Sequence, residues 1–280
     1  MSILLVDIGN TRVKWATFAR GQLGRQKAAA HEGWGGERIA KLVIGKVSRG
    51  ASKRVVASKR DAPASNDIRS EMKGIQRIVV VSVAGARVDR AFASEARRRL
   101  GIAPEFFRST RRAGDVTTLY SEPWRLGADR LAGVIGAFHL SKHRPVCVVS
   151  VGTAMTLDVV DARGRHRGGA IVPSPALMVG SLLSQTHGIR RRARGGSNGG
   201  GLFARSTRVA ITEGARYAAS AIADRAVKEA RAVLGQSPLM LLTGGAAPVI
   251  RKLIRTRHRH VPDLVLQGLA VIASARQTRS

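Results

Sequence analysis

The first residues that could do chemistry follow a short apolar run at the N-terminus. Asp7, Gly9, Asn10 and Thr11 stand in the turn that comes directly after residues 3–6. A tight turn of this composition points backbone N–H groups at its mouth, which suits phosphate oxygens. Gly9 allows close approach because it has no Cβ. Asp7 carries the hard oxygen ligands that Mg²⁺ prefers, and Lys14 beyond the turn can contact a terminal phosphate as a point charge.

Two further glycine turns follow apolar segments later in the chain. Residues 146–151 are expected to form a buried strand that leads into a turn with Thr153, whose hydroxyl can donate to a phosphate. Residues 239–242 are expected to form another strand before Gly244 and Gly245, which make space for a base and a ribose. Neither a P-loop nor a GxGxxG motif is present. Three turns in this order favour a nucleotide-binding protein.

Asp129 is the candidate general base. It stands in the run Gly127-Ala128-Asp129-Arg130, at the start of a segment with apolar residues at helical spacing. One interpretation is a helix cap, in which the carboxylate accepts backbone N–H groups. The other is a base that accepts the proton of an alcohol during phosphoryl transfer. In that case Arg130 could bind a carboxylate of the substrate.

The elements that must position these residues show a half-length repeat. Residues 4–11 and 148–154 both read as an apolar strand, a glycine turn with small polar side chains and a returning strand. Such a repeat predicts two similar domains that face one another. The apolar spacing also predicts another strand at 77–83. It predicts helices at 37–43, 89–100, 127–139, 176–183, 212–234, 248–254 and 264–274.

The charge and composition limit the function classes. The formal net charge is +30, which attracts nucleotides, nucleic acids and other anions without selecting a fold. The basic residues are scattered, and aromatic residues are only 4%, so stacking platforms for single strands are not indicated. The single cysteine, Cys147, excludes an intrachain disulfide and is expected to be buried. No apolar run is long enough to cross a bilayer and no leader is evident, so we expect a cytoplasmic protein.

The motifs together resemble the type III pantothenate kinase family. The likeness runs in order over nearly the whole chain, at residues 7–14, 120–130, 152–158, 168–173, 243–245 and 261–269. It implies an α/β fold of the actin, sugar-kinase and Hsp70 type, with two ribonuclease-H-like domains of mixed sheets flanked by helices and a nucleotide cleft between them. The expected domains are residues 1–115 and 116–280.

The resemblance also implies an activity and a set of site residues. The activity is ATP-dependent phosphorylation of pantothenate, the first step of coenzyme A synthesis, by a homodimer. It needs Mg²⁺ on ATP and a monovalent cation, K⁺ or ammonium. Asp129 would be the base. The ATP-binding residues would be Asp7, Ile8, Gly9, Asn10, Thr11, Arg12, Val13, Lys14, Thr153, Gly244 and Gly245. The pantothenate-binding residues would be Tyr120, Gly127, Ala128, Asp129, Arg130 and Thr186.

This sequence departs from the family pattern at several positions. Ser150 stands where the family usually has the Asp that helps to hold the monovalent cation, and a hydroxyl is a poorer ligand than a carboxylate. Thr118 replaces the usual Asn, and Ser174 replaces a Gly. Residues 195–201 resemble a flexible glycine-rich insertion. The alternative function is a non-catalytic relative that acts as a transcription accessory or nucleic-acid-associated factor.

Overall fold

The chain forms two compact units, each assembled from separate stretches of sequence. The computed structural model describes residues 1–48, 74–193 and 201–275. The first unit contains the described residues of Met1–Ser109, Trp124–Ala132 and Val265–Ser280, and the second contains those of Thr110–Pro123 and Gly133–Leu264. The division into domains at residue 115 stays a prediction.

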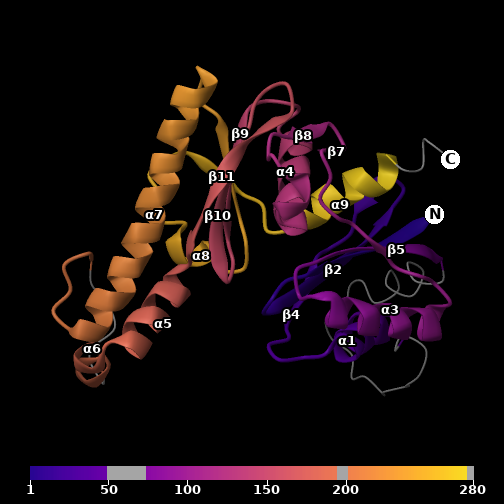
Figure 1. Cartoon of the computed structure of the whole chain (residues 1–280), viewed down its shortest axis with the longest axis horizontal. Helices are drawn as coiled ribbons and strands as arrows, with labels where there is room; N and C mark the ends of the chain where they lie inside the picture. The colour runs from indigo at the N-terminus through magenta and orange to yellow at the C-terminus, as the bar shows by residue number, and fades with distance from the viewer. Residues whose placement is uncertain (49–73, 194–200, 276–280) are drawn as a thin grey trace, which may run out of the picture. The chain divides into compact units, whose positions relative to one another are not determined.

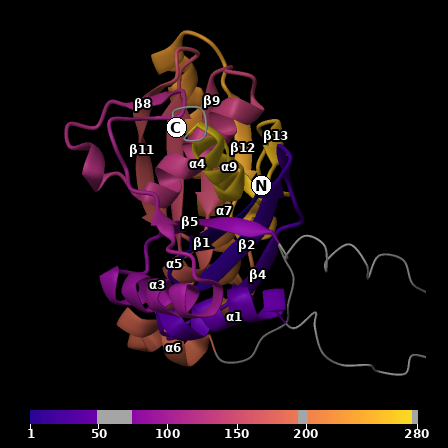
Figure 2. The same ribbon diagram turned by 90° about the vertical axis from the view of Figure 1, so that its right-hand side faces the viewer.

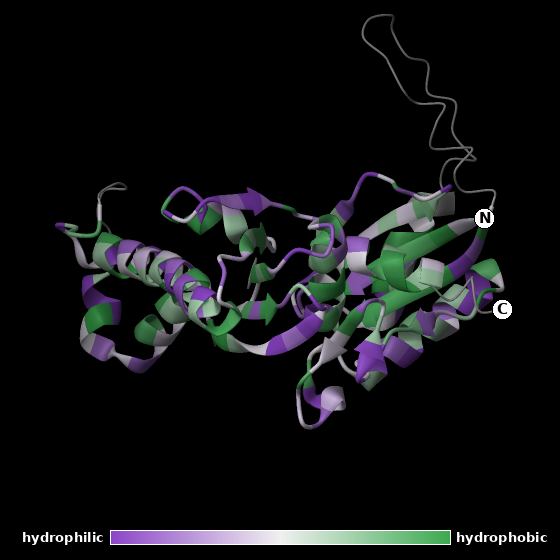
Figure 3. Cartoon of the chain, turned by 90° about the horizontal axis from the view of Figure 1, so that it is seen from above, coloured by the Kyte–Doolittle hydropathy of each residue, from purple (hydrophilic) through white to green (hydrophobic). Residues whose placement is uncertain are grey.

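The first unit is built on a mixed six-stranded sheet. Strand β1 pairs antiparallel with β2 and parallel with β5, in the order β3-β2-β1-β5-β6, and β4 also pairs with β2. The apolar residues 3–6 of β1 are buried, as a strand between two neighbours should be. Strands near the N-terminus are green, the hydrophobic colour, in Figure 3. The strands are β1 (Ser2–Ile8), β2 (Arg12–Ala19), β3 (Gln22–Leu23), β4 (Lys27–Ala30), β5 (Ile75–Ser82) and β6 (Glu105–Phe106).

Two helices bury their apolar faces against this sheet. Helices α1 (Gly36–Ser48) and α3 (Ala86–Leu100) lie side by side (Figures 1 and 2). Ile39, Ile44 and Phe92 pack in one core cluster with the side chains of β1. Both helices were expected from their apolar spacing, and both predictions are confirmed.

The second unit is built on a seven-stranded sheet with the order β13-β12-β9-β10-β11-β8-β7. Strand β9 pairs parallel with β12 and antiparallel with β10, so it is enclosed on both edges. The strands are β7 (Arg112–Ala113), β8 (Val116–Thr118), β9 (Val146–Val151), β10 (Ala154–Val160), β11 (Arg165–Pro173), β12 (Leu239–Thr243) and β13 (His258–His260).

The long helix α7 (Thr207–Leu234) covers one face of the second sheet (Figure 1). Its Ala219 and Ala223 pack in a core cluster with Cys147 and Val149. Cys147 is buried as expected, and burial raises the pKa of its thiol to about 12. The other helical segments with residues in this unit are η2 (Pro123–Arg125), α4 (Ala128–Leu140), α5 (Pro175–Gln185), α6 (His187–Arg192), α8 (Ala247–Ile250) and α9 (Leu264–Ala275), some of which begin or end in the first unit.

The predicted repeat is present as two hairpins of the same design. In each unit a buried strand, β1 or β9, leads through a glycine turn into an antiparallel partner, and its other edge pairs with a parallel strand. Within the described ranges no helix is long and apolar enough to span a membrane. Residues 195–200 of the predicted glycine-rich insertion lie outside the described residues.

Candidate active site

The first glycine turn joins β1 to β2 and closes on its own backbone. The Gly9 N–H donates to the carbonyl oxygen of Arg12 at 3.0 Å. Asp7 and Lys14 lie opposite one another in the ladder. Because opposite residues point to the same face of a sheet, the hairpin holds this carboxylate and this ammonium group on one face. The predicted phosphate-binding residues 7–14 therefore all belong to one rigid element.

His31 braces this turn, although its sequence context did not mark it. Its Nε2 donates to the Gly9 carbonyl oxygen at 2.8 Å, and its backbone N–H donates to the Thr11 carbonyl oxygen at 2.9 Å. The ring is only 3% exposed. A carbonyl oxygen can only accept, so Nε2 must carry the proton. His31 lies between β4 and α1, and none of the predicted motifs included it.

Asp7 is a buried carboxyl group with a shifted pKa. Burial raises the pKa of Asp7 from 3.8 to about 6, Lys14 opposes the rise, and the Asp129 carboxylate adds to it. Asp7 and Asp129 therefore lie within electrostatic reach of one another, and both belong to the first unit. A pair of interacting carboxylates with one partly desolvated is typical of functional sites. The predicted Mg²⁺ ligand and the predicted base therefore interact electrostatically.

Gly127 makes room for the Asp129 carboxylate at the start of α4. Asp129 Oδ1 accepts the Arg130 N–H at 2.8 Å, and a Cβ atom on Gly127 would lie 2.7 Å from that oxygen. The Leu131 N–H donates to the Gly127 carbonyl oxygen at 3.0 Å, which starts the helix. Asp129 is the second residue of α4, so this bond to the adjacent N–H is not the bond that an N-cap makes to the N–H two or three residues further on. A local role at the start of the helix also does not account for the effect of the Asp129 carboxylate on the pKa of Asp7.

In the second unit the other two glycine turns are neighbours. The Ala246 N–H donates to the Val151 carbonyl oxygen at 2.9 Å, directly before the turn that carries Thr153. Gly244 has a φ of +96°, and a Cβ there would clash with the backbone of Val151. Only glycine allows this close approach. The structure therefore places Gly244 against the end of β9, directly before the turn that carries Thr153.

Ser150 lies in a row of hydroxyl side chains across three strands. Its Cα partners are Thr156 on β10 and Thr243 on β12. Thr243 is 2% exposed, and its Oγ1 has no hydrogen-bond partner within the described part of the chain. A buried polar atom of this kind usually has a ligand or water. This row offers oxygen atoms but no formal negative charge.

The remaining predicted substrate residues lie in two places. Gly127, Ala128 and Arg130 accompany Asp129 in the first unit. Tyr120 and Thr186 belong to the second unit. Tyr120 stacks on His166, with 5.8 Å between ring centroids and 18° between ring planes, and this partner was not foreseen.

Thr186 follows helix α5 and is already hydrogen-bonded within its own segment. Its Oγ1 donates to the Leu182 carbonyl oxygen at 2.6 Å. Its role toward pantothenate stays a prediction. Ser174, at the usual glycine position, caps α5 by accepting the Leu177 N–H at 3.3 Å.

The described residues contain no group of three or more His, Cys, Asp and Glu side chains that could hold a metal ion. Mg²⁺ that accompanies a nucleotide does not need such a group, because it takes one or two carboxylates and completes its shell with phosphates and water. Asp7, buried at a strand end beside the phosphate turn, suits that kind of site.

Comparison with known proteins supplies a family. The model of the type III pantothenate kinase family matches residues 3–229. A type III pantothenate kinase of Nitrosococcus oceani is 33% identical over 277 residues, which cover 97% of this chain and 93% of that protein. The Aromatoleum aromaticum protein is 35% identical, over 97% of this chain and 97% of its own length. The Azoarcus sp. protein is also 35% identical, over 98% of this chain and 91% of its own length.

Solved structures show the same fold at low identity. A Campylobacter jejuni protein assigned to the Baf family of transcriptional activators has a TM-score of 0.54 and 16% identity, over 98% of this chain and 99% of its own. Component A of the (R)-2-hydroxyglutaryl-CoA dehydratase of Acidaminococcus fermentans has a TM-score of 0.50 and 11% identity, over the full length of both chains. The predicted α/β fold, with mixed sheets flanked by helices, is confirmed.

The family match covers most of the chain, and the matched range includes the two hairpins and the start of α4. The relatives also match over nearly their whole lengths. The chain belongs to the type III pantothenate kinase family.

Proposed function

We propose that this protein transfers the γ-phosphoryl group of ATP to the hydroxyl group of pantothenate, giving 4'-phosphopantothenate for coenzyme A synthesis. The observation that carries the proposal is the electrostatic interaction of Asp129 with Asp7, which stands directly before the phosphate turn, in a chain of this family. A transcription accessory or nucleic-acid-associated role has no comparable support, because the curated relatives with these motifs are named as pantothenate kinases.

The proposed chemistry assigns each residue a task. The N–H groups of the first turn, Lys14 and the Thr153 hydroxyl bind phosphate oxygens, and Gly244 and Gly245 leave space for the nucleoside. Asp129 accepts the proton of the pantothenate hydroxyl as the bond to phosphorus forms. Tyr120, Arg130 and Thr186 bind the rest of pantothenate.

Asp7 would hold Mg²⁺, directly or through water. The raised pKa of about 6 shows that its charge is poorly compensated by the protein, so a cation there would stabilise the ionised form. Bound Mg²⁺ supplies charge neutralisation for the phosphates in the transition state. The residues present fit this ion.

The monovalent cation has a weaker site in this chain. Ser150, Thr156 and Thr243 provide hydroxyl oxygens where the family has a carboxylate, and the buried Thr243 Oγ1 has no hydrogen-bond partner within the described residues. Neutral oxygens can contact K⁺ or ammonium but bind it less tightly than a carboxylate does. We propose that this enzyme uses K⁺ or ammonium only weakly.

We also propose that the protein is a cytoplasmic homodimer. The surface that supports a second copy is an apolar groove of about 710 Å³ between α5 and α7. Leu177 and Leu182 in this groove are 48% and 41% exposed. An exposed apolar surface of this kind is typical of protein interfaces.

The experiment is a coupled ADP-release assay with purified protein, ATP, Mg²⁺ and pantothenate. Wild-type protein should release ADP only when pantothenate is present. Asp129→Asn keeps the size of the side chain but removes the base, so turnover should fall about 100-fold or more. Wild-type turnover in the Asn variant would disprove the assignment of the base. Absence of pantothenate-dependent ADP release from the wild type would disprove the function.

A further inference from the structure

A continuous hydrogen-bond chain is buried in the second unit behind Tyr120. His166 Nε2 lies 2.8 Å from Asp158 Oδ1, and His166 Nδ1 lies 3.2 Å from Thr118 Oγ1. The Tyr120 backbone N–H donates to the same Thr118 Oγ1 at 3.2 Å. Thr118 and His166 are 0% exposed and Asp158 is 1% exposed. We call these three residues the buried relay.

The sheet fixes the geometry of the relay. Thr118 on β8 is the register partner of His166 on β11, and the Leu119 N–H donates to the His166 carbonyl oxygen at 3.1 Å. His166 also lies opposite Val160 on β10, beside a register shift in that ladder. Because side chains alternate along a strand, Asp158 points to the same face as Val160 and therefore as His166. The three side chains meet because three neighbouring strands present them on one face.

The hydrogen bonds run in one direction. We assign the ring proton of His166 to Nε2, because its partner is a carboxylate oxygen, and we assign the lone pair to Nδ1, beside the Thr118 hydroxyl. Nδ1 then accepts the Thr118 hydroxyl proton, and the hydroxyl oxygen accepts the Tyr120 N–H. Each donor and acceptor in the relay has a partner, which buried polar groups need.

The order of hydroxyl, imidazole and carboxylate is that of a nucleophilic triad, but burial excludes that role. A nucleophile must meet its substrate, and the Thr118 hydroxyl belongs to a side chain with 0% exposure. What the relay does reach is Tyr120, which is partly exposed and stacks on the His166 ring. Arg111 also holds this segment by donating to the carbonyl oxygens of Thr118, Tyr120 and Ser121.

We propose that the buried relay of Thr118, His166 and Asp158 is a positioning device that fixes Tyr120 for pantothenate binding. The inference rests on the proposed function, in which Tyr120 lines the pantothenate site. The Thr118 hydroxyl performs this task at a position where the family usually has an amide side chain. The relay acts on substrate affinity and takes no part in proton transfer to or from the reacting hydroxyl.

The test compares Thr118→Val with Thr118→Ser. Valine keeps the shape of threonine but removes the hydroxyl, so the Tyr120 N–H and His166 Nδ1 lose their common partner. The KM for pantothenate should rise about tenfold, while kcat and the KM for ATP stay within about twofold of wild type. Serine restores the hydroxyl and should return the KM for pantothenate to near the wild-type value.

A double-mutant cycle separates positioning of Tyr120 from general damage. On a Tyr120→Ala background, Thr118→Val should cause no further rise in the KM for pantothenate, because the ring that it positions is gone. Additive effects, or an equal loss of ATP affinity, would contradict the proposal. A valine variant with wild-type KM would contradict it as well.

A wild-type measurement keeps the inference testable if the valine variant folds poorly. In ¹⁵N spectra of histidine-labelled protein, the His166 signals, assigned as those that move in Thr118→Ser, should show the neutral form protonated on Nε2 and should shift on titration with pantothenate. The opposite tautomer, or no shift at saturation, would overturn the relay. Wild-type protein that neither binds nor phosphorylates pantothenate would overturn the proposed function and the inference together, whereas normal turnover with unmoved His166 signals would overturn the inference alone.

Discussion

Asp7 shows how burial of one ionisable side chain makes stability depend on pH. The pKa of Asp7 is raised from 3.8 to about 6, chiefly by burial. The folded state therefore holds this proton more tightly than the unfolded chain does. The protonated Asp7 side chain therefore contributes fully to the stability of the fold below about pH 4. This contribution is lost as the pH rises through about 6.

Asp7→Asn should remove this pH dependence because an amide does not ionise. Relative to wild type, the variant should gain about 2 to 3 kcal/mol in free energy of unfolding between about pH 4 and about pH 8, without Mg²⁺ or nucleotide. Urea denaturation at both pH values measures the difference. Asp115→Asn is the control, because the Asp115 side chain is 65% exposed. A gain that is the same at both pH values would show that burial of the Asp7 charge is not the cause.

Ser150 allows the cation site to be tested in one substitution. Ser150→Asp restores a carboxylate beside Thr243, and K⁺ should then stimulate turnover more strongly than it does in the wild type. The assay compares potassium and sodium chloride at equal ionic strength, with Ser150→Ala as the matched control. An unchanged ratio in the Asp variant would place any cation elsewhere.

At the residue scale, the sequence identified candidate site residues more reliably than the side chains that contact them. Asp7 and Asp129 were singled out, and the structure brings them within electrostatic reach. His31 and the relay were not found, because each depends on contacts between segments that no local pattern encodes. His166 lies 48 residues from Thr118 along the chain.

At the scale of elements, the turns depend on backbone approaches that only glycine permits. Gly244→Ala would place a Cβ against the Val151 backbone at a φ of +96°. We expect a loss of about 3 kcal/mol in stability, since both strain and a clash must be relieved. Urea denaturation measures it, and Gly180→Ala on α5, where a Cβ would meet nothing within 4 Å, is the control. Equal stability of the two variants would contradict the close approach.

The elements themselves were largely predictable. The strands at 3–6 and 146–151 are apolar runs, and α1, α3 and α4 follow the helical spacing of apolar residues. Boundaries were less accurate: α7 begins at Thr207, five residues before the predicted start, because Ser206 caps it by accepting the Val209 N–H. β11 begins at Arg165 and includes His166, which no predicted strand contained.

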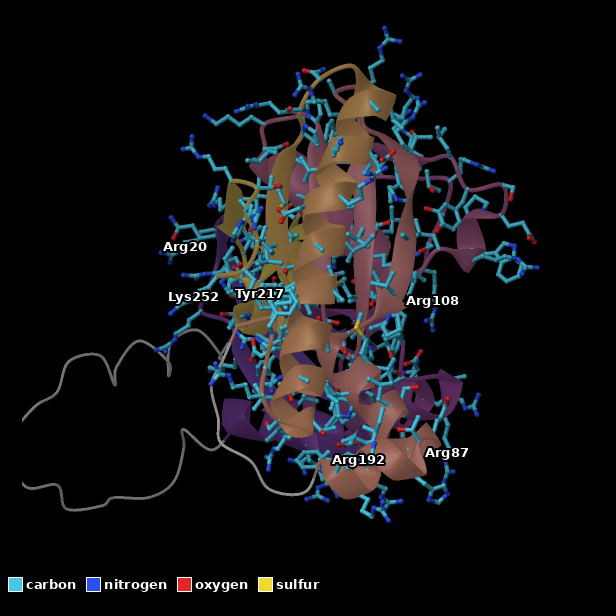
Figure 4. All side chains as sticks on the ribbon, turned by 90° about the vertical axis from the view of Figure 1, so that its left-hand side faces the viewer. Arg20, Arg87, Arg108, Arg192, Tyr217 and Lys252 are labelled. Atoms are coloured by element: carbon cyan, nitrogen blue, oxygen red, sulfur yellow. The ribbon has the colours of Figure 1, made fainter. Side chains whose placement is uncertain are left out.

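At the scale of the whole molecule, the net charge of +30 predicts binding to polyanions without selectivity. Arg20, Arg87, Arg192 and Lys252 come from four separate segments, and their side chains project from the ribbon in Figure 4. DNA affinity should therefore fall at least about tenfold between roughly 50 and 200 mM salt and should not depend on sequence. Fluorescence anisotropy with two unrelated duplexes measures both. Sequence-selective binding that survives physiological salt would instead support a role in gene expression.

The groove between α5 and α7 makes oligomeric state the other property at this scale. Leu177 is 48% exposed in the groove, and a second copy would remove its side chain from water. Light scattering should give about twice the chain mass of 29.8 kDa for the wild type. Leu177→Glu should shift the protein to the monomer, because a charge in an apolar interface cannot be desolvated without a partner. Val233→Glu is the matched control, since Val233 is 59% exposed on α7 and does not line the groove. A wild-type monomer, or a dimer that persists in Leu177→Glu, would show that copies of this chain do not meet at this groove.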